Sequence, residues 1–199
     1  FFFTKGLLQE GYPNGGDNVS HYDLLLNTID TIKLYFQTGE LRFWNNDYYL
    51  GFPMFFFYTP LPYLLLALLY LVTGIEPLIL FKWSIVILFS ALPIVFYFSS
   101  LIMKLEKEFT LGIAVFSTTL SSTTVFGLEY YAFFATGLFS QLWGVFFFPL
   151  AFAFAYRYLV LGKGKAFLPV LLLFFTFISH IFIGIITAFA VSILIICCL

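Results

Sequence analysis

The sequence has little charge. Only 10% of its 199 residues are Asp, Glu, Lys or Arg, while 62% are hydrophobic and the mean hydropathy is +1.01. Soluble domains carry about 25% charged residues, and a water-soluble core of this size could not bury so much Phe, Leu and Ile. The composition therefore predicts an all-α, polytopic bundle of transmembrane helices. The net charge of −1 excludes a basic surface for nucleic acid.

Cysteine and histidine are also scarce. The two cysteines, Cys197 and Cys198, are adjacent in an apolar run, so they predict packing rather than a disulfide framework or a metal site. There is no Gly-Lys-Ser/Thr phosphate loop and no Gly-x-Ser-x-Gly elbow. The energy for any reaction must therefore come with the substrate. The chain starts at Phe1 without an initiator Met and stops within an apolar run, and we expect an internal fragment of a longer protein.

One long polar segment, residues 5–53, interrupts the apolar sequence and holds more than half of the acidic residues. We expect residues 4–54 to form a long outer loop. Within it, apolar residues at helical spacing over 20–38 predict an amphipathic helix in the membrane interface. Ser20 is its expected N-cap with Asp23 in a capping-box position, and Gly39 its expected C-terminal glycine. The apolar stripe is expected to comprise Tyr22, Leu25, Leu26, Ile29, Ile32 and Phe36, with Asp23, Asn27, Asp30 and Thr31 opposite.

Five later segments are apolar enough to be membrane helices. They are residues 77–103, 109–126, 138–160, 166–180 and 181–199. Residues 55–73 contain a shorter apolar run that opens with Pro60 and Pro62, so we expect a re-entrant or juxtamembrane helix there rather than a span. Lys82, near the outer end of its helix, is expected to snorkel beside Trp83.

Basic residues predict the orientation of these helices. Beyond Lys82, all Lys and Arg fall in two clusters, Lys104 with Lys107, and Arg157 with Lys163 and Lys165. Both clusters should be cytoplasmic. If residues 55–73 do not cross, the polar loop, Glu129 and His180 all lie on the opposite, outer face.

Two acids and two histidines on that face are candidates for chemistry. Asp17 and His21 fall near the start of the predicted helix, whose positive end favours phosphate. A carboxylate there could hold Mg²⁺ or Mn²⁺ against a phosphate or act as a general base. Glu129 and His180 are polar groups near apolar segments, where such residues often have functions. The alternatives are a helix-capping role for Asp17, a loop carboxylate at Glu129, and a helix–helix hydrogen bond at His180.

Four motifs occur in a fixed order before the first long apolar helix. They are Gly-Gly-Asp-Asn-Val-Ser-His at 15–21, Trp-Asn at 44–45, Gly-Phe-Pro at 51–53 and Tyr-Thr-Pro-Leu-Pro-Tyr at 58–63. This order resembles the N-terminal part of GT-C-type membrane glycosyltransferases, in particular the membrane proteins labelled "6-pyruvoyl-tetrahydropterin synthase-related". The label implies no pterin chemistry, and no residue here supports any.

The resemblance implies a GT-C-like helical fold in the cell membrane with an extracytoplasmic active site. It also implies inverting transfer of a sugar from a polyprenyl-phosphate carrier and, in many members, a divalent metal. The first-loop acid corresponds to Asp17. The second corresponds to Glu129, a single Glu where the family often has Asp or a paired motif.

We therefore expect a glycosyltransferase with Asp17 and Glu129 as catalytic acids or ligands of Mg²⁺ or Mn²⁺. The expected substrate contacts are His21, His180, Trp44, Asn45 and Tyr58, and the expected partners are a polyprenyl-phosphate-linked sugar and membrane lipid. A transporter or lipid flippase is the alternative, although such proteins place polar groups at mid-membrane, where this sequence has few. A non-catalytic membrane scaffold is the third interpretation.

Overall fold

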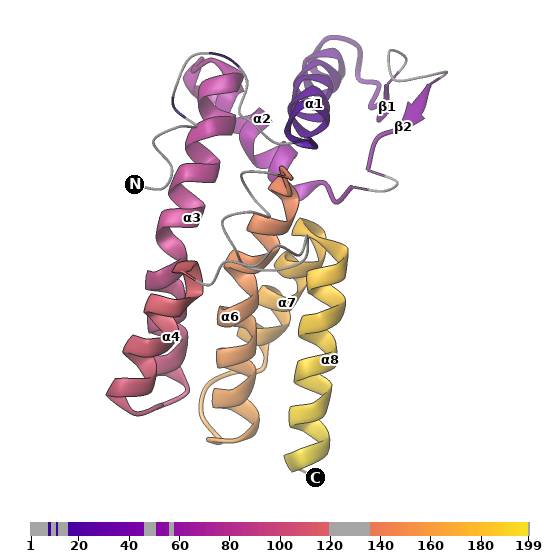
Figure 1. Ribbon diagram of the computed structural model, residues 1–199. Coiled ribbons are helices and arrows are strands. Elements are labelled where there is room, and N and C mark those ends of the chain that lie inside the picture. The colour runs from indigo at the N-terminus through magenta and orange to yellow at the C-terminus, as the bar shows by residue number, and fades with distance from the viewer. Residues whose placement is uncertain are drawn as a thin grey trace.

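The computed structural model describes residues 8, 11, 16–45, 51–55, 58–119 and 136–198. These residues are mostly helical, as predicted, apart from a small two-stranded ribbon (Figure 1). The helices are α1 (Asn18–Thr38), α2 (Leu61–Thr73), α3 (Pro77–Ile102), α4 (Lys107–Thr119), α6 (Phe139–Leu159), α7 (Phe167–Ser179) and α8 (Ile181–Cys198). The ribbon pairs β1 (Trp44–Asn45) with β2 (Phe52–Pro53) in antiparallel register.

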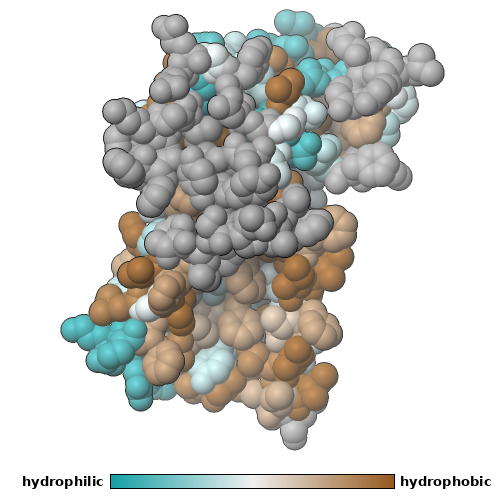
Figure 2. Space-filling view, in the orientation of Figure 1, coloured by the Kyte–Doolittle hydropathy of each residue, from teal (hydrophilic) through white to brown (hydrophobic). Residues whose placement is uncertain are grey.

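The helices divide into an upper end and a lower bundle in the view of Figure 1. The lower bundle contains most of α3 together with α4, α6, α7 and α8, whereas α1, α2 and the ribbon lie at the upper end. Figure 2 shows mainly apolar surface over the lower bundle and a more mixed surface above it. The upper end therefore contains most of the polar segment recognised in the sequence.

Three of the described helices, α3, α6 and α8, are long and apolar enough to cross a membrane. Helices α2 and α7 are apolar but shorter. The described part of the predicted helix 109–126 is α4, which starts two residues earlier, at Lys107; residues 120–126 lie outside the described residues. The three long helices agree with the expected membrane character, since each could cross a bilayer.

Helix α1 starts at Asn18 with Asp17 in the N-cap position. The predicted start at Ser20 and the capping box with Asp23 are therefore wrong, since both residues lie inside the helix. A tertiary contact sets the start, because the Asp17 N–H donates to the Thr136 carbonyl at 3.0 Å. The predicted end is confirmed: Gly39 is left-handed (φ 76°), and its N–H donates to the Tyr35 carbonyl.

The buried face of α1 includes Leu25, Ile29 and Ile32, as the apolar spacing predicts. Phe36 is 74% exposed, however, contrary to its place in the predicted stripe. The reason is that α2 is shorter than α1. Lys33 of α1 already lies beside the last turn of α2, where its Nζ donates a hydrogen bond to the Tyr70 hydroxyl. The last turn of α1 extends beyond that partner. Thr31, predicted to be on the polar face, is buried and donates to the Arg42 carbonyl.

Helices α7 and α8 pack differently from α1. Their buried positions are small or hydroxylated: Thr176, Ser179, Gly184 and Thr187. The Thr187 hydroxyl donates to the Ile183 carbonyl of its own helix at 2.6 Å. Large apolar side chains such as Phe182 and Phe189 point outward. Small residues inside and large apolar residues outside are typical of helices that face lipid.

Candidate functional site

A small hollow at the upper end lies between α1, the ribbon and the segment that leads into α2. Its lining residues are Ser20, Asp23, Leu24, Asn45, Phe52 and Tyr58. Asn45 is 3% exposed, and its Nδ2 donates to Asp23 Oδ2 at 3.2 Å. The ribbon places Asn45 opposite Phe52. Residues from all four motifs noted in the sequence thus line one hollow beside α1.

The other residue of β1, Trp44, pairs with Pro53 and lies at the surface, half exposed. Its indole covers Gly51, where a Cβ atom would stand only 2.7 Å from Trp44 Nε1. Gly51 also has φ +105°, a conformation that side chains other than glycine rarely adopt. The glycine therefore allows Trp44 to fold over the ribbon, next to Asn45 but not in the lining of the hollow.

His21 lies behind the hollow, 2% exposed, and shares a 2.6 Å hydrogen bond between its Nδ1 and the Tyr63 hydroxyl. The edge of its ring meets Tyr58 at a centroid distance of 5.1 Å. Burial, and secondly the nearby His180, lower the pKa of His21 to about 3. Burial, with Tyr58 next in effect, raises the pKa of Tyr63 well above its usual value. Both groups are neutral at pH 7, so His21 positions Tyr58 and α2 rather than presenting a surface charge.

His180 joins α7 to α8 and lies against α6. A Cβ atom on Gly144 would come within 2.9 Å of the His180 Cβ, so the glycine allows this close approach. The Ile183 N–H donates to His180 Nδ1 at 3.4 Å, a contact within its own turn. Next to it, the Thr59 hydroxyl donates to the Ser179 carbonyl. His180 is thus tied to the segment Tyr58–Thr59 that borders the hollow.

Asp17 is exposed at the start of α1. Within the described residues its side chain makes no capping hydrogen bond, so the helix-capping interpretation does not account for it. Gly137, at φ +80°, packs so closely on α1 that a Cβ atom there would stand 2.6 Å from the Asn18 nitrogen. The turn that leads into α6 therefore fixes the backbone of Asp17.

Glu129, the second predicted acid, lies outside the described residues. It precedes Thr136 by seven positions in the sequence, a distance of at most about 25 Å along an extended chain. The described chain resumes at Thr136, whose carbonyl accepts a hydrogen bond from the Asp17 N–H.

Metal ligation remains an expectation. Among the described residues, no group of three or more His, Cys, Asp or Glu side chains could hold a metal ion. Asp17 offers a carboxylate of the kind that Mg²⁺ and Mn²⁺ prefer. One carboxylate does not make a site.

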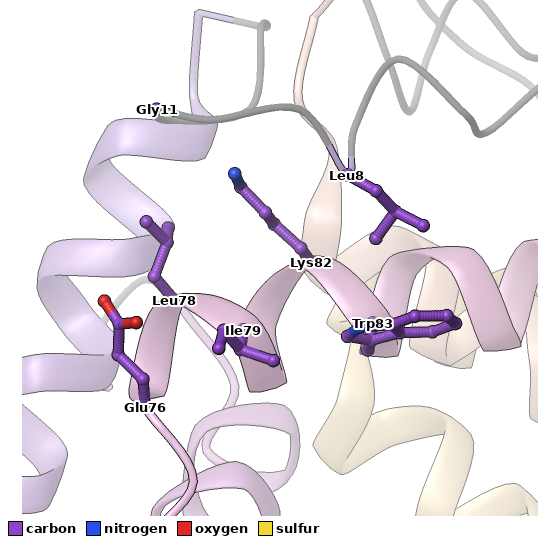
Figure 3. A pocket seen from close by; sticks show the side chains of 7 residues that line it. All are labelled: Leu8, Gly11, Glu76, Leu78, Ile79, Lys82 and Trp83. Atoms are coloured by element: carbon purple, nitrogen blue, oxygen red, sulfur yellow. The ribbon is translucent and has the colours of Figure 1, made fainter.

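A larger cleft, of about 340 Å³, lies at the start of α3. Figure 3 shows the Lys82 side chain rising from α3 toward Gly11, with Glu76 and Leu78 toward one end of the cleft and Trp83 toward the other. Lys82 is 7% exposed, so it does not snorkel to the surface as predicted. The protein surrounds it instead.

Sequence reasoning missed two polar residues at this end. It assigned Asp23 to a capping box, which concealed its contact with Asn45. Lys82 had a usable signal, since it is the only charged residue between Glu76 and Lys104. A lone cation in an apolar helix is a functional candidate by default.

These features define a class: a helical protein with membrane-length apolar helices and a polar end at which motif residues from distant parts of the chain converge. No protein-family model, curated protein or solved structure matches the chain.

Proposed function

We propose that this protein is an integral-membrane glycosyltransferase that moves a sugar from a polyprenyl-phosphate carrier to an acceptor at the extracytoplasmic face. The observation that carries the proposal is the placement of Asp17. Its carboxylate is exposed and lacks a capping bond within the described residues, and its backbone N–H is held by the Thr136 carbonyl. The hollow formed by Asp23, Asn45 and Tyr58 borders the same helix.

In this proposal Asp17 acts as the general base. It accepts the proton of the acceptor hydroxyl while the acceptor oxygen forms a bond to the anomeric carbon. The bond from that carbon to the phosphate oxygen breaks, and its electron pair leaves with the lipid phosphate. Attack opposite the leaving group inverts the anomeric centre. A divalent ion, if bound, would be held by Asp17 and Glu129 and would neutralise charge on the phosphate.

The Lys82 cleft suits the leaving group. It combines the Lys82 ammonium group with apolar walls that include Leu78 and Trp83, and its one carboxylate, Glu76, lies toward one end. An ammonium group beside apolar walls is what a lipid phosphate requires. Helix α3 has 26 residues and is therefore about 39 Å long, whereas the hydrocarbon core is about 30 Å thick. The excess length corresponds to about six residues. If it lies at the start of α3, residues 77–82, which include Lys82, lie outside the hydrocarbon core.

The proposal also requires that α2 does not cross the membrane and that the lower end of the bundle is cytoplasmic. Helix α2 has 13 residues, too few to span a bilayer that needs about 20, and it packs along α1. The α3–α4 turn and the α6–α7 loop, which carry the two basic clusters, both lie at the lower end in Figure 1. A cytoplasmic lower end agrees with the distribution of Lys and Arg.

The test replaces Asp17 by Asn. Asp17→Asn should express and melt like the wild type, because no capping bond is lost. Its turnover of a polyprenyl-phosphate sugar should fall by about 10²- to 10⁴-fold, the usual contribution of a general base. Asp30→Asn is the matched control, since Asp30 is a second exposed aspartate on α1, and it should keep full activity. Near-normal turnover in Asp17→Asn would contradict the proposal and favour a transporter or scaffold.

A further inference from the structure

A cationic cavity lies at the lower end of the bundle, remote from the proposed active site. Its volume is about 220 Å³, and it is lined by Phe154, Arg157, Lys163, Gly164, Lys165 and Leu168. Three cations thus border one cavity, and none of its lining residues is acidic. Within the described part of the chain, the only ion pair joins Arg42 to Glu40 at the other end.

The loop between α6 and α7 is folded to bring these cations together. The Lys163 N–H donates to the Arg157 carbonyl at 3.0 Å, which turns the loop back onto α6. Gly162 and Gly164 are both left-handed, with φ +61° and +96°, a conformation favoured by glycine. A Cβ atom on Gly164 would stand 3.9 Å from Arg157 Nε. Basic residues that only orient the chain in the membrane need to be on the cytoplasmic side. They do not need to line a common cavity, as these three do.

An apolar stripe continues from the cavity along α7. Phe167, Val170 and Phe174 are all exposed, and their spacing of three and four residues places them on one face of the helix. A molecule with a negatively charged head and hydrocarbon tails matches a cationic cavity that is followed by an apolar stripe. Basic pockets between membrane helices on the cytoplasmic side are suited to anionic lipid headgroups.

We propose that this cavity binds the phosphate of an anionic phospholipid, whose acyl chains lie along the exposed face of α7. The proposal goes beyond the glycosyltransferase function and does not depend on it. Free inorganic phosphate shares the headgroup chemistry but makes no use of the apolar stripe.

Native mass spectrometry of the purified protein in detergent tests the proposal, with phosphatidylglycerol, phosphatidylcholine and inorganic phosphate as probes. Phosphatidylglycerol should be retained in preference to phosphatidylcholine. Each Lys or Arg near the surface accounts for about fivefold in affinity for anionic lipid. The double variant Lys163→Gln/Lys165→Gln should therefore lose roughly 25-fold. Arg157→Gln, tested separately, should lose about fivefold.

The control is Lys104→Gln/Lys107→Gln, which removes two exposed cations outside the cavity lining, in the other basic cluster. It should keep wild-type lipid binding. Equal retention of the two lipids, or equal losses in the two double variants, would overturn the proposal. Inorganic phosphate that displaces phosphatidylglycerol at equal concentration would also overturn it, since the cavity would then bind a free anion.

Discussion

Helices α1 and α8 are similar in length, with 21 and 18 residues, but they bury opposite kinds of side chain. Helix α1 buries large residues such as Leu25 and Ile29, and two of its buried polar side chains, His21 and Thr31, bond to other parts of the chain. Helix α8 buries only Gly184 and Thr187 and exposes its large apolar side chains. The first pattern is that of a soluble core, and the second is that of a helix in lipid.

Different surroundings, water around α1 and lipid around α8, would account for this difference. In water, burial of apolar area stabilises by about 25 cal/mol per Å², so α1 turns its large apolar side chains inward. Lipid tails are as apolar as Leu, so this driving force is absent between membrane helices, and close backbone packing through small residues takes its place. Gly184 illustrates this, because a Cβ atom there would lie 2.8 Å from the Phe177 Cα.

The largest expected effect comes from charging the two exposed faces. Phe189 on α8 and Phe36 on α1 are 67% and 74% exposed. If α8 faces lipid, Phe189→Asp should disfavour membrane insertion by about 2.5–3.5 kcal/mol. Phe36→Asp should change stability by less than about 0.5 kcal/mol, as surface substitutions usually do. A translocon insertion assay measures the first value, and thermal unfolding in detergent measures the second. Similar values for the two would break the comparison.

A smaller effect is expected from adding one methyl group at two helical glycines. Gly184→Ala should destabilise by about 1–3 kcal/mol, because the new Cβ overpacks the contact with Phe177. Gly112→Ala on α4 has nothing within 4 Å of the added atom. It should stabilise by up to about 1 kcal/mol through helix propensity. Thermal unfolding in detergent measures both changes, and a stabilised Gly184→Ala variant would contradict the packing described for α7 and α8.

The smallest effect is that of a change of one pH unit. Folding lowers the pKa of His21 from 6.5 to about 3, so between these values the unfolded chain binds a proton that the folded chain does not. Stability should therefore fall as the pH drops below 6.5, by about 1 kcal/mol over the first unit and at most about 1.4 kcal/mol per unit after it.

The comparison variant for this prediction is His21→Asn, which removes the titrating group. Its unfolding temperature in detergent should depend less on pH than that of the wild type. Helix α8, which contains no His, Asp or Glu, should make no contribution. Identical pH profiles for the two proteins would show that His21 is not buried in its neutral form.

Much of the architecture was predictable because it depends on local patterns. Long apolar runs gave α3, α6 and α8, Pro60 and Pro62 marked the start of the short α2, and Gly39 marked the end of α1. For the candidate site, the sequence predicted individual residues but not their spatial arrangement. Asp17, Asn45 and Tyr58 could be nominated from motifs, but no local pattern states which of them meet.

The sequence by itself therefore determined most of the helices, since hydropathy and helix-stop signals act within one or two turns. Only the tertiary structure decided where α1 begins, because Thr136 lies more than 100 positions from Asp17. It also decided that Asp23 bonds Asn45 rather than capping its helix, and that His21 and Lys82 are buried. These outcomes depend on hydrogen bonds and packing between distant segments, whose free energy no local pattern contains.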